Sequence, residues 1–144
     1  MKKLYLALVD ALDQLGIFAY VDFDYGQLKE TEPSVAYPAA LIKINVPSIE
    51  EHQKKLIEES ASFEILVVSK QIGDTNNLTS EAIRSNSLAY LDSIEAVRNA
   101  LQGNQFEDSG SISYKGATER DLRKGLKTIA LRFEVSYVVQ IASS

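Results

Sequence analysis

The sequence predicts an α+β fold, with one domain over residues 1–144 that contains a mostly antiparallel sheet of about five strands and two helices packed on one face. A length of 144 residues is typical of a single domain. Apolar residues recur at helical spacing over 2–15 and 80–102, whereas they follow a strand-like alternation over 126–141. Strand-like runs joined by short loops favour antiparallel hairpins, against which amphipathic helices bury their apolar stripes.

The amino-terminal segment is predicted to be a helix over 2–15. Its leucines are spaced by three or four residues, so they share one face. Gly16 follows, and glycine readily takes the left-handed conformation that ends a helix. Asp10 and Asp13 interrupt the apolar run, which distinguishes it from a signal peptide and predicts a cytoplasmic protein.

Three strand-like runs follow the first helix. The run over 18–25 is rich in aromatic and β-branched residues, and those over 39–46 and 63–68 are almost continuously apolar. Proline cannot donate a hydrogen bond within a sheet. Pro47 is therefore expected to lie at the end of the second strand rather than inside it.

The stretch Ser48–Ser60 fits two structures. Ser48 and Glu51 have the spacing of a capping box, which would begin a helix. The part from Leu56 onward slightly favours a strand instead, and both alternatives stay open from the sequence.

The second half of the chain is predicted to hold a long helix over 80–102, a short strand over 111–115 and a closing strand over 126–141. Alternation in the closing strand assigns its side chains to two faces. The face expected toward the helices contains Ile129, Leu131, Phe133, Val135, Tyr137 and Val139. The opposite face contains Arg132, Glu134 and Ser136.

The amino-acid composition and the absence of known motifs argue against several classes of function. The chain has no cysteine, so a disulfide framework, a thiolate metal site and a cysteine nucleophile are all unavailable to it. Its one histidine, His52, lies in a charged stretch and is expected on the surface. The glycines are scattered singly and form no phosphate-binding loop. No apolar run approaches the ~20 residues that span a bilayer. We therefore expect no enzyme, no cofactor and no membrane partner.

Metal binding would have to depend on carboxylates such as Asp22 and Asp24, which lie two residues apart. Side chains two apart in a strand point to the same side, so the pair could bind a metal or divide acid and base roles. An ordinary solvated strand face looks the same. We expect no metal site there.

Charge is distributed unevenly along the chain. The net charge of −5 argues against specific nucleic-acid binding, which depends on a surplus of basic residues. Two unlike segments nevertheless stand out, and unlike patches on one subunit are what a head-to-tail contact requires. The basic segment contains Arg120, Arg123, Lys124 and Lys127. The acidic segment contains Asp22, Asp24, Glu30 and Glu32.

The chain resembles the tail terminator proteins of long-tailed bacteriophages and prophages. The resemblance is carried by the helix 2–15, the segment 21–27, the helix 80–102 and the strand 131–137, and it covers nearly the whole chain. It implies a homo-oligomeric ring, commonly a hexamer, which closes the head-proximal end of the tail. It also implies tail-tube and head–tail connector proteins as partners, with assembly in the host cytoplasm and a final place in the virion tail. The family has no active-site motif, so no functional residue carries over.

Two other function classes remain open from the sequence. One is a small-ligand-binding or hydrolytic enzyme whose cleft lies between the sheet and the second helix and uses Tyr90, Tyr114 or Asp22. A deep pocket with a perturbed carboxylate would support it. The other is a monomeric adaptor that binds a protein through an unpaired strand edge.

Overall fold

A computed structural model of the chain describes residues 2–30, 35–53, 56–70, 77–106 and 109–140, with the backbone alone at 46–53, 56, 57, 86, 87, 139 and 140. In chain order the elements are α1 (Lys2–Gln14), β1 (Tyr20–Phe23), the 3-10 helix η1 (Gln27–Lys29), β2 (Ala39–Gln53), β3 (Leu56–Lys70), α2 (Glu81–Ser87), α3 (Tyr90–Leu101), β4 (Ser113–Glu119) and β5 (Leu126–Gln140).

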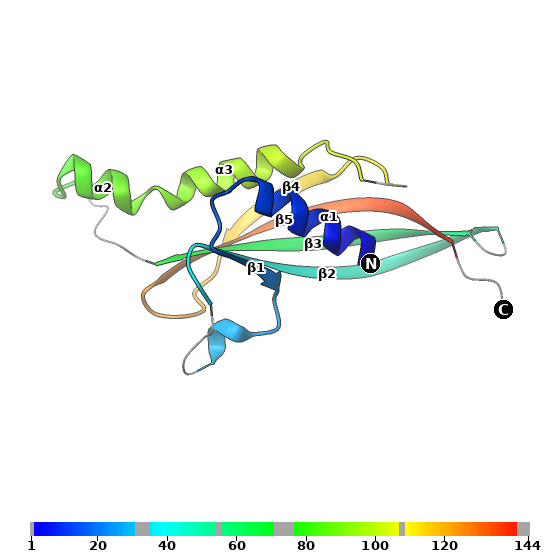
Figure 1. Ribbon diagram of the computed structural model, residues 1–144, viewed down its shortest axis with the longest axis horizontal. Coiled ribbons are helices and arrows are strands. Elements are labelled where there is room, and N and C mark those ends of the chain that lie inside the picture. The colour runs from blue at the N-terminus through cyan, green and yellow to red at the C-terminus, as the bar shows by residue number, and fades with distance from the viewer. Residues whose placement is uncertain (1, 31–34, 54–55, 71–76, 107–108, 141–144) are drawn as a thin grey trace.

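The five described strands form one mixed sheet in the order β1-β2-β3-β5-β4, which confirms the predicted α+β class (Figure 1). Strands β2, β3, β5 and β4 pair antiparallel, but β1 pairs parallel with β2. The expectation of hairpins between successive strands is wrong for β1 and β2. The chain between β1 and β2 returns to the end of the sheet where β1 begins, so the two strands run in the same direction.

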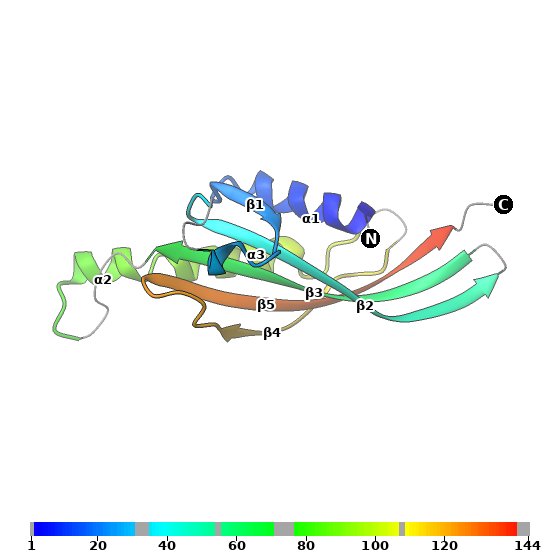
Figure 2. The same cartoon turned by 90° about the horizontal axis from the view of Figure 1, so that it is seen from below.

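Helices α1 and α3 cover one face of this sheet (Figures 1 and 2). Phe63 and Phe133 face each other across β3 and β5, and their rings stack with centroids 5.2 Å apart. The main core forms around this pair and takes in residues from both helices, including Leu4, Leu8, Leu12, Val97 and Leu101. The predicted inward face of β5 is confirmed from Ile129 to Tyr137, while the side chain of Val139 lies outside the described residues.

A second, smaller core lies on the opposite face, at one end of the sheet. Leu28 of η1 and the partly buried Leu122 cover apolar side chains of the sheet there. The sheet residues in this core are Ala39, Leu41, Leu66, Val68 and Ala130. Both faces of the sheet are therefore covered at this end. This explains the continuous apolar run over 65–68 in β3, where side chains on both faces are buried.

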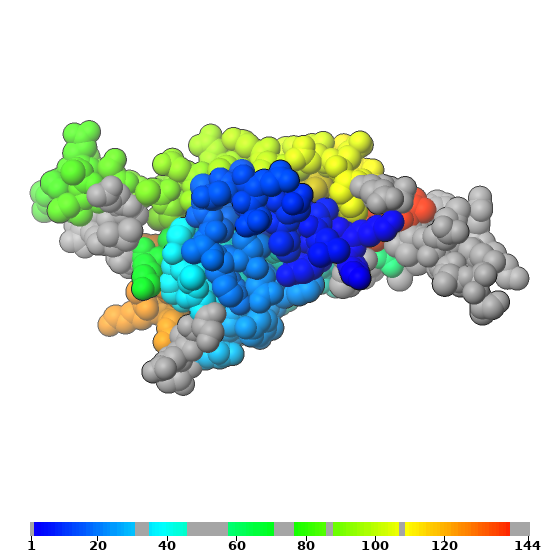
Figure 3. Space-filling model, viewed as in Figure 1, coloured from blue at the N-terminus to red at the C-terminus, as the bar shows by residue number. Residues whose placement is uncertain are grey.

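The helix expected over 80–102 is two helices. At the break, the amide of Leu91 donates to the carbonyl of Leu88 (3.0 Å) and that of Asp92 to the carbonyl of Ala89 (3.1 Å), which are i−3 rather than i−4 bonds. The run Ser85-Asn86-Ser87 precedes the break, and such residues are poor helix formers because they compete for backbone hydrogen bonds. Helix α2 projects past the end of the sheet (Figures 1 and 3).

Strand β2 does not end at Pro47, so that prediction is wrong. The strand continues to Gln53, with irregular register between Asn45 and Ser48. Proline is tolerated because β1 pairs only with Ala39–Ile42, and no described strand pairs with the outer edge of β2 beyond that point. Within the stretch Ser48–Ser60, residues 48–53 belong to β2 and 56–60 to β3, so the helical alternative is wrong for these described residues and the strand from Leu56 is confirmed.

The shared end of β2 and β3, residues 48–53 and 56–59, is called the arm. Figures 1 and 2 show these long, curved strands extending past the part of the sheet that α1 and α3 cover, beside the end of β5. The remaining strands differ slightly from the prediction, because β1 is shorter than 18–25 and β4 extends beyond 111–115. None of the described helices is long and apolar enough to cross a membrane.

Candidate interaction surface

The face of the sheet opposite the helices carries an open polar groove beyond the small core. Register places Lys43, Glu64 and Arg132 in one row across β2, β3 and β5, with Asn45, Ser62 and Glu134 in the next row. Two adjoining hollows of about 470 and 300 Å³ lie over these rows. The polar groove is lined by Lys43, Asn45, Ser60, Ser62, Glu64, Ser111, Ser113, Lys115, Arg120, Arg132, Glu134 and Ser136.

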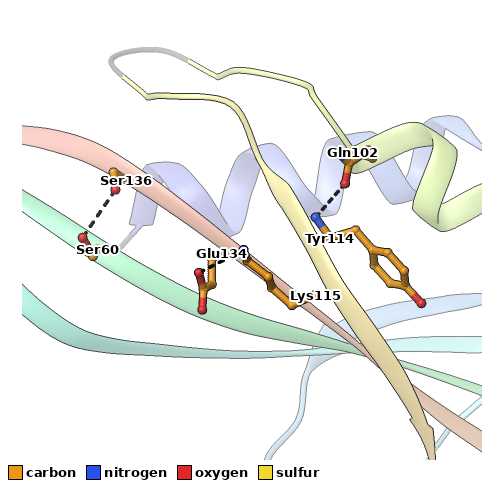
Figure 4. Close-up of polar contacts among 6 residues, drawn as sticks. All are labelled: Ser60, Gln102, Tyr114, Lys115, Glu134 and Ser136. Carbon is orange, nitrogen blue, oxygen red and sulfur yellow. Dashed lines mark hydrogen bonds and ion pairs between the residues drawn. The ribbon is translucent and has the colours of Figure 1, made fainter.

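Ion pairs fix part of this groove. Arg120 Nη2 lies 2.7 Å from Glu64 Oε1, and Lys115 Nζ lies 3.7 Å from Glu134 Oε2 (Figure 4). Arg132 Nη1 donates to the Thr118 hydroxyl at 2.6 Å. Four basic side chains thus face two acidic ones, so the groove has an excess of positive charge in a chain whose net charge is −5.

The far end of the groove is lined with hydroxyl groups. The hydroxyls of Ser60 and Ser136 lie 3.4 Å apart on register-partner residues of β3 and β5 (Figure 4). Serine side chains are short, and each hydroxyl can both donate and accept a hydrogen bond. The Gln102 side-chain oxygen accepts a hydrogen bond from the Tyr114 amide at 2.6 Å, which ties the end of α3 to β4 along the border of this sheet.

Asp22 is engaged within its own subunit. Its Oδ2 accepts a hydrogen bond from the Tyr20 hydroxyl (2.9 Å), and its Oδ1 accepts from the Tyr5 hydroxyl (3.4 Å). Burial, followed by this hydrogen bond, raises the pKa of Tyr20 to about 12, and burial and the Asp22 charge also raise the pKa of Tyr5. Since Tyr5 belongs to α1 and also stacks on Phe23, the carboxylate helps to anchor α1 to β1.

Asp24 has a different role from Asp22. Its Oδ1 accepts a hydrogen bond from the Gly26 amide (3.1 Å) and so stabilises the turn after β1. In the described part of the chain, no three His, Asp or Glu side chains gather into a group that could hold a metal ion.

The basic segment contacts its own subunit. Arg123 Nη1 donates to the carbonyls of Leu28 (3.3 Å) and Glu30 (2.5 Å), and Arg120 pairs with Glu64. The structure therefore places the basic segment beside part of the acidic segment of the same chain. Lys124 is exposed, Lys127 is half-buried, and Glu32 lies outside the described residues.

The residues proposed for an enzymatic cleft have separate surroundings. Tyr114 packs on Phe133 and lies under the Arg98 guanidinium, 5.8 Å from its ring centroid. Burial, with a contribution from Glu119, raises the pKa of Tyr90. Asp22 lies instead with Tyr5 and Tyr20. The side chain of His52 lies outside the described residues.

Sequence analysis missed the buried Gln27 and most of the polar groove. Gln27 Nε2 donates to the Phe23 carbonyl (2.8 Å) and its Oε1 accepts from the Tyr25 amide (3.0 Å), so this side chain holds the turn that leads into η1. The alternation of apolar and polar residues in β5 predicts that Arg132 and Glu134 lie on its outer face. This pattern does not show which side chains of β2, β3 and β4 lie beside them.

Neither a protein-family model nor a curated protein matches this chain. Among the described side chains, the raised pKa values belong to Tyr5, Tyr20, Tyr90 and Tyr137, and burial is the largest cause in each. The polar groove lies over strands β2, β3, β4 and β5.

Proposed function

We propose that this chain is a structural assembly subunit and not an enzyme. Copies of it join head to tail into a ring, as in the tail terminator proteins that it resembles, at the head-proximal end of a phage or prophage tail. The observation that carries the proposal is the large polar groove on the open face of the sheet, together with an arm that extends beyond the helix-covered sheet. The polar side chains that line the groove, and the described side chains of the arm, belong to neither apolar core.

The character of the groove supports binding of protein rather than chemistry on a small molecule. It is an open hollow on the face of the sheet, and basic and acidic side chains alternate across it. Charged pairs of this type set the orientation of a partner more than its affinity. None of the raised pKa values named above belongs to a groove side chain.

The open edge of β2 supports a ring more than a strand-binding adaptor. The edge contains Pro47, which cannot donate a hydrogen bond to an added strand. Irregular register also occurs between Asn45 and Ser48 and between Glu51 and Gln53. Natural proteins use prolines and bulges on edges to hinder strand addition.

The resemblance implies the partners of the proposed ring, which are tail-tube and head–tail connector proteins. The ring would bind them in the host cytoplasm during assembly and would stay with them in the virion tail. Nucleic acid and membrane are not among the proposed partners. The groove alternates cations with carboxylates, whereas a phosphate-binding surface needs a strong surplus of cations.

Light scattering on the native protein tests this function, alone and in the presence of tail-tube protein. We expect a discrete closed oligomer, or one that forms at the ends of tail tubes. Genes for capsid, portal and tail-tube proteins are expected beside the gene for this chain. A protein that stays monomeric under both conditions and belongs to a metabolic operon would contradict the proposal.

A further inference from the structure

We infer that the polar groove of one subunit receives the arm of a neighbouring copy of this chain. The inference rests on the proposed head-to-tail assembly and names the two surfaces that meet. It replaces the acidic segment around Asp22 and Asp24 as the expected partner of the basic surface, because both of those carboxylates accept hydrogen bonds within their own subunit.

The position of the arm suits this role. It extends beyond the part of the sheet covered by α1 and α3 (Figure 2), and no described side chain of the arm belongs to either apolar core. Pairing of β2 with β3, and of β3 with β5, gives the arm a hydrogen-bonded backbone without a partner subunit. It can therefore enter a neighbour as a preformed element, which lowers the entropic cost of binding.

The arm and the groove have opposite net charges, which favours the arm as the segment that binds in the groove. The sequence stretch 48–60, which contains the arm, has four glutamates and two lysines, an excess of two negative charges. The groove has four basic and two acidic side chains, an excess of two positive charges. The four glutamates of the arm are Glu50, Glu51, Glu58 and Glu59, whereas the two lysines of this stretch, Lys54 and Lys55, lie outside the described residues.

The register within the arm adds a second reason. Glu50 is the partner of Glu58 across β2 and β3. Register thus makes two acidic residues neighbours in the arm. Basic side chains of a neighbouring groove, such as Lys43 and Lys115, have the complementary charge. Both lie on the exposed face of the sheet, and Lys115 is 49% exposed.

A contact between arm and groove joins unlike surfaces. Each bound subunit leaves its own groove or its own arm available for another copy. Such heterologous contacts form a ring when the rotation between neighbours closes and a filament when it does not. The inferred contact therefore supplies the geometry that the proposed ring requires.

Charge reversal on each surface tests the contact. The groove variant is Lys115→Glu with Arg132→Glu, and the arm variant is Glu50→Lys with Glu58→Lys. We expect each variant alone to associate at least about tenfold more weakly than the native protein, measured by sedimentation across concentration. An equimolar mixture of the two is expected to regain association, because every contact then joins opposite charges. A control variant, Lys2→Glu with Arg84→Glu, changes the charge of α1 and α2 and is expected to associate normally.

Disulfide trapping supplies a second measurement if a charge-reversed chain fails to fold. The native chain has no cysteine, so single substitutions introduce the only thiols. A mixture of Glu58→Cys and Ser62→Cys chains is expected to form cross-linked dimers faster than a mixture of Glu58→Cys and Ser80→Cys chains. Equal rates in the two mixtures would count against the contact.

The outcomes separate this inference from the proposed function. Native-strength association in both charge-reversed variants would overturn the arm-and-groove contact and leave the ring proposal standing. A native protein that is monomeric both alone and with tail-tube protein would overturn the two together. Loss of association in each variant, with recovery in the mixture, supports both.

Discussion

The two faces of the sheet have the same strands beneath them but different coverings. On one face, α1 and α3 exclude water along most of the sheet. On the other, η1 and the loop before β5 cover only one end, and the rest is the polar groove. This difference is visible along strand β5. Residues Thr128–Leu131 are all buried, whereas buried and more exposed residues alternate over Arg132–Val138. The pattern of burial along one strand therefore shows how far the elements that cover each face extend.

The largest effect is expected at the helix-covered face. Phe133→Ala should lower the free energy of unfolding by about 3–5 kcal/mol, because it leaves a cavity beside Phe63. Glu134→Ala, on the other face, should change it by less than about 1 kcal/mol, because its ion pair with Lys115 is exposed. Urea unfolding of both variants measures the difference. A loss below about 1 kcal/mol for Phe133→Ala would mean that the faces are reversed.

A smaller loss is expected in the second core. Leu28→Ala should cost about 2 kcal/mol, at the low end of the range for buried leucine, because loops that cover this core can partly collapse into the space. Leu78→Ala is the matched control, since Leu78 is 91% exposed. Urea unfolding measures both. Equal effects of the two substitutions would show that the second core does not stabilise the fold.

The contact between the basic segment and η1 is expected to contribute less. Arg123→Met removes the donors to the carbonyls of Leu28 and Glu30 and should cost about 1 kcal/mol. Hydrogen exchange at the amides of η1 should show faster opening. Lys124→Met tests the exposed neighbour and is expected to stay within roughly 0.5 kcal/mol of the native chain. A similar result for both variants would mean that the loop before β5 does not hold η1.

The smallest effect concerns Tyr20 at the edge of the sheet and appears only at alkaline pH. Burial raises the pKa of Tyr20 from 10.0 to about 12, so the folded state binds this proton more tightly than the unfolded state. The resulting stabilisation is present below pH 10.0 and is lost as the pH rises toward 12. Tyr20→Phe should therefore make the fall in the free energy of unfolding shallower over this interval.

Asp22→Asn is the matched control for the Tyr20 experiment. It removes the carboxylate but leaves the burial, which is the larger cause of the raised pKa. Its pH dependence should fall between those of the native chain and Tyr20→Phe. Urea unfolding across this pH interval measures all three proteins. An unchanged slope in Tyr20→Phe would show that this tyrosine keeps its ordinary pKa in the fold.

Features that depend on local periodicity could be predicted from the residues alone. Leu4, Leu8 and Leu12 recur at helical spacing, so α1 and its buried stripe follow from neighbouring residues alone. The alternation from Leu131 to Tyr137 likewise assigned two faces to β5, because side chains in a strand must alternate. Together with the order of these segments, such patterns were sufficient for the α+β class.

Which segments lie side by side depends on contacts between distant parts of the chain, which local patterns do not reveal. Pro47 is tolerated inside β2 because β1 leaves that edge unpaired, and the parallel pairing of β1 depends on the path of the chain around η1. The polar groove likewise requires the register that places Lys43, Glu64 and Arg132 in one row. Local patterns assign a side chain to a face, but register between distant strands selects its neighbours, and the energies that set register come from long-range packing.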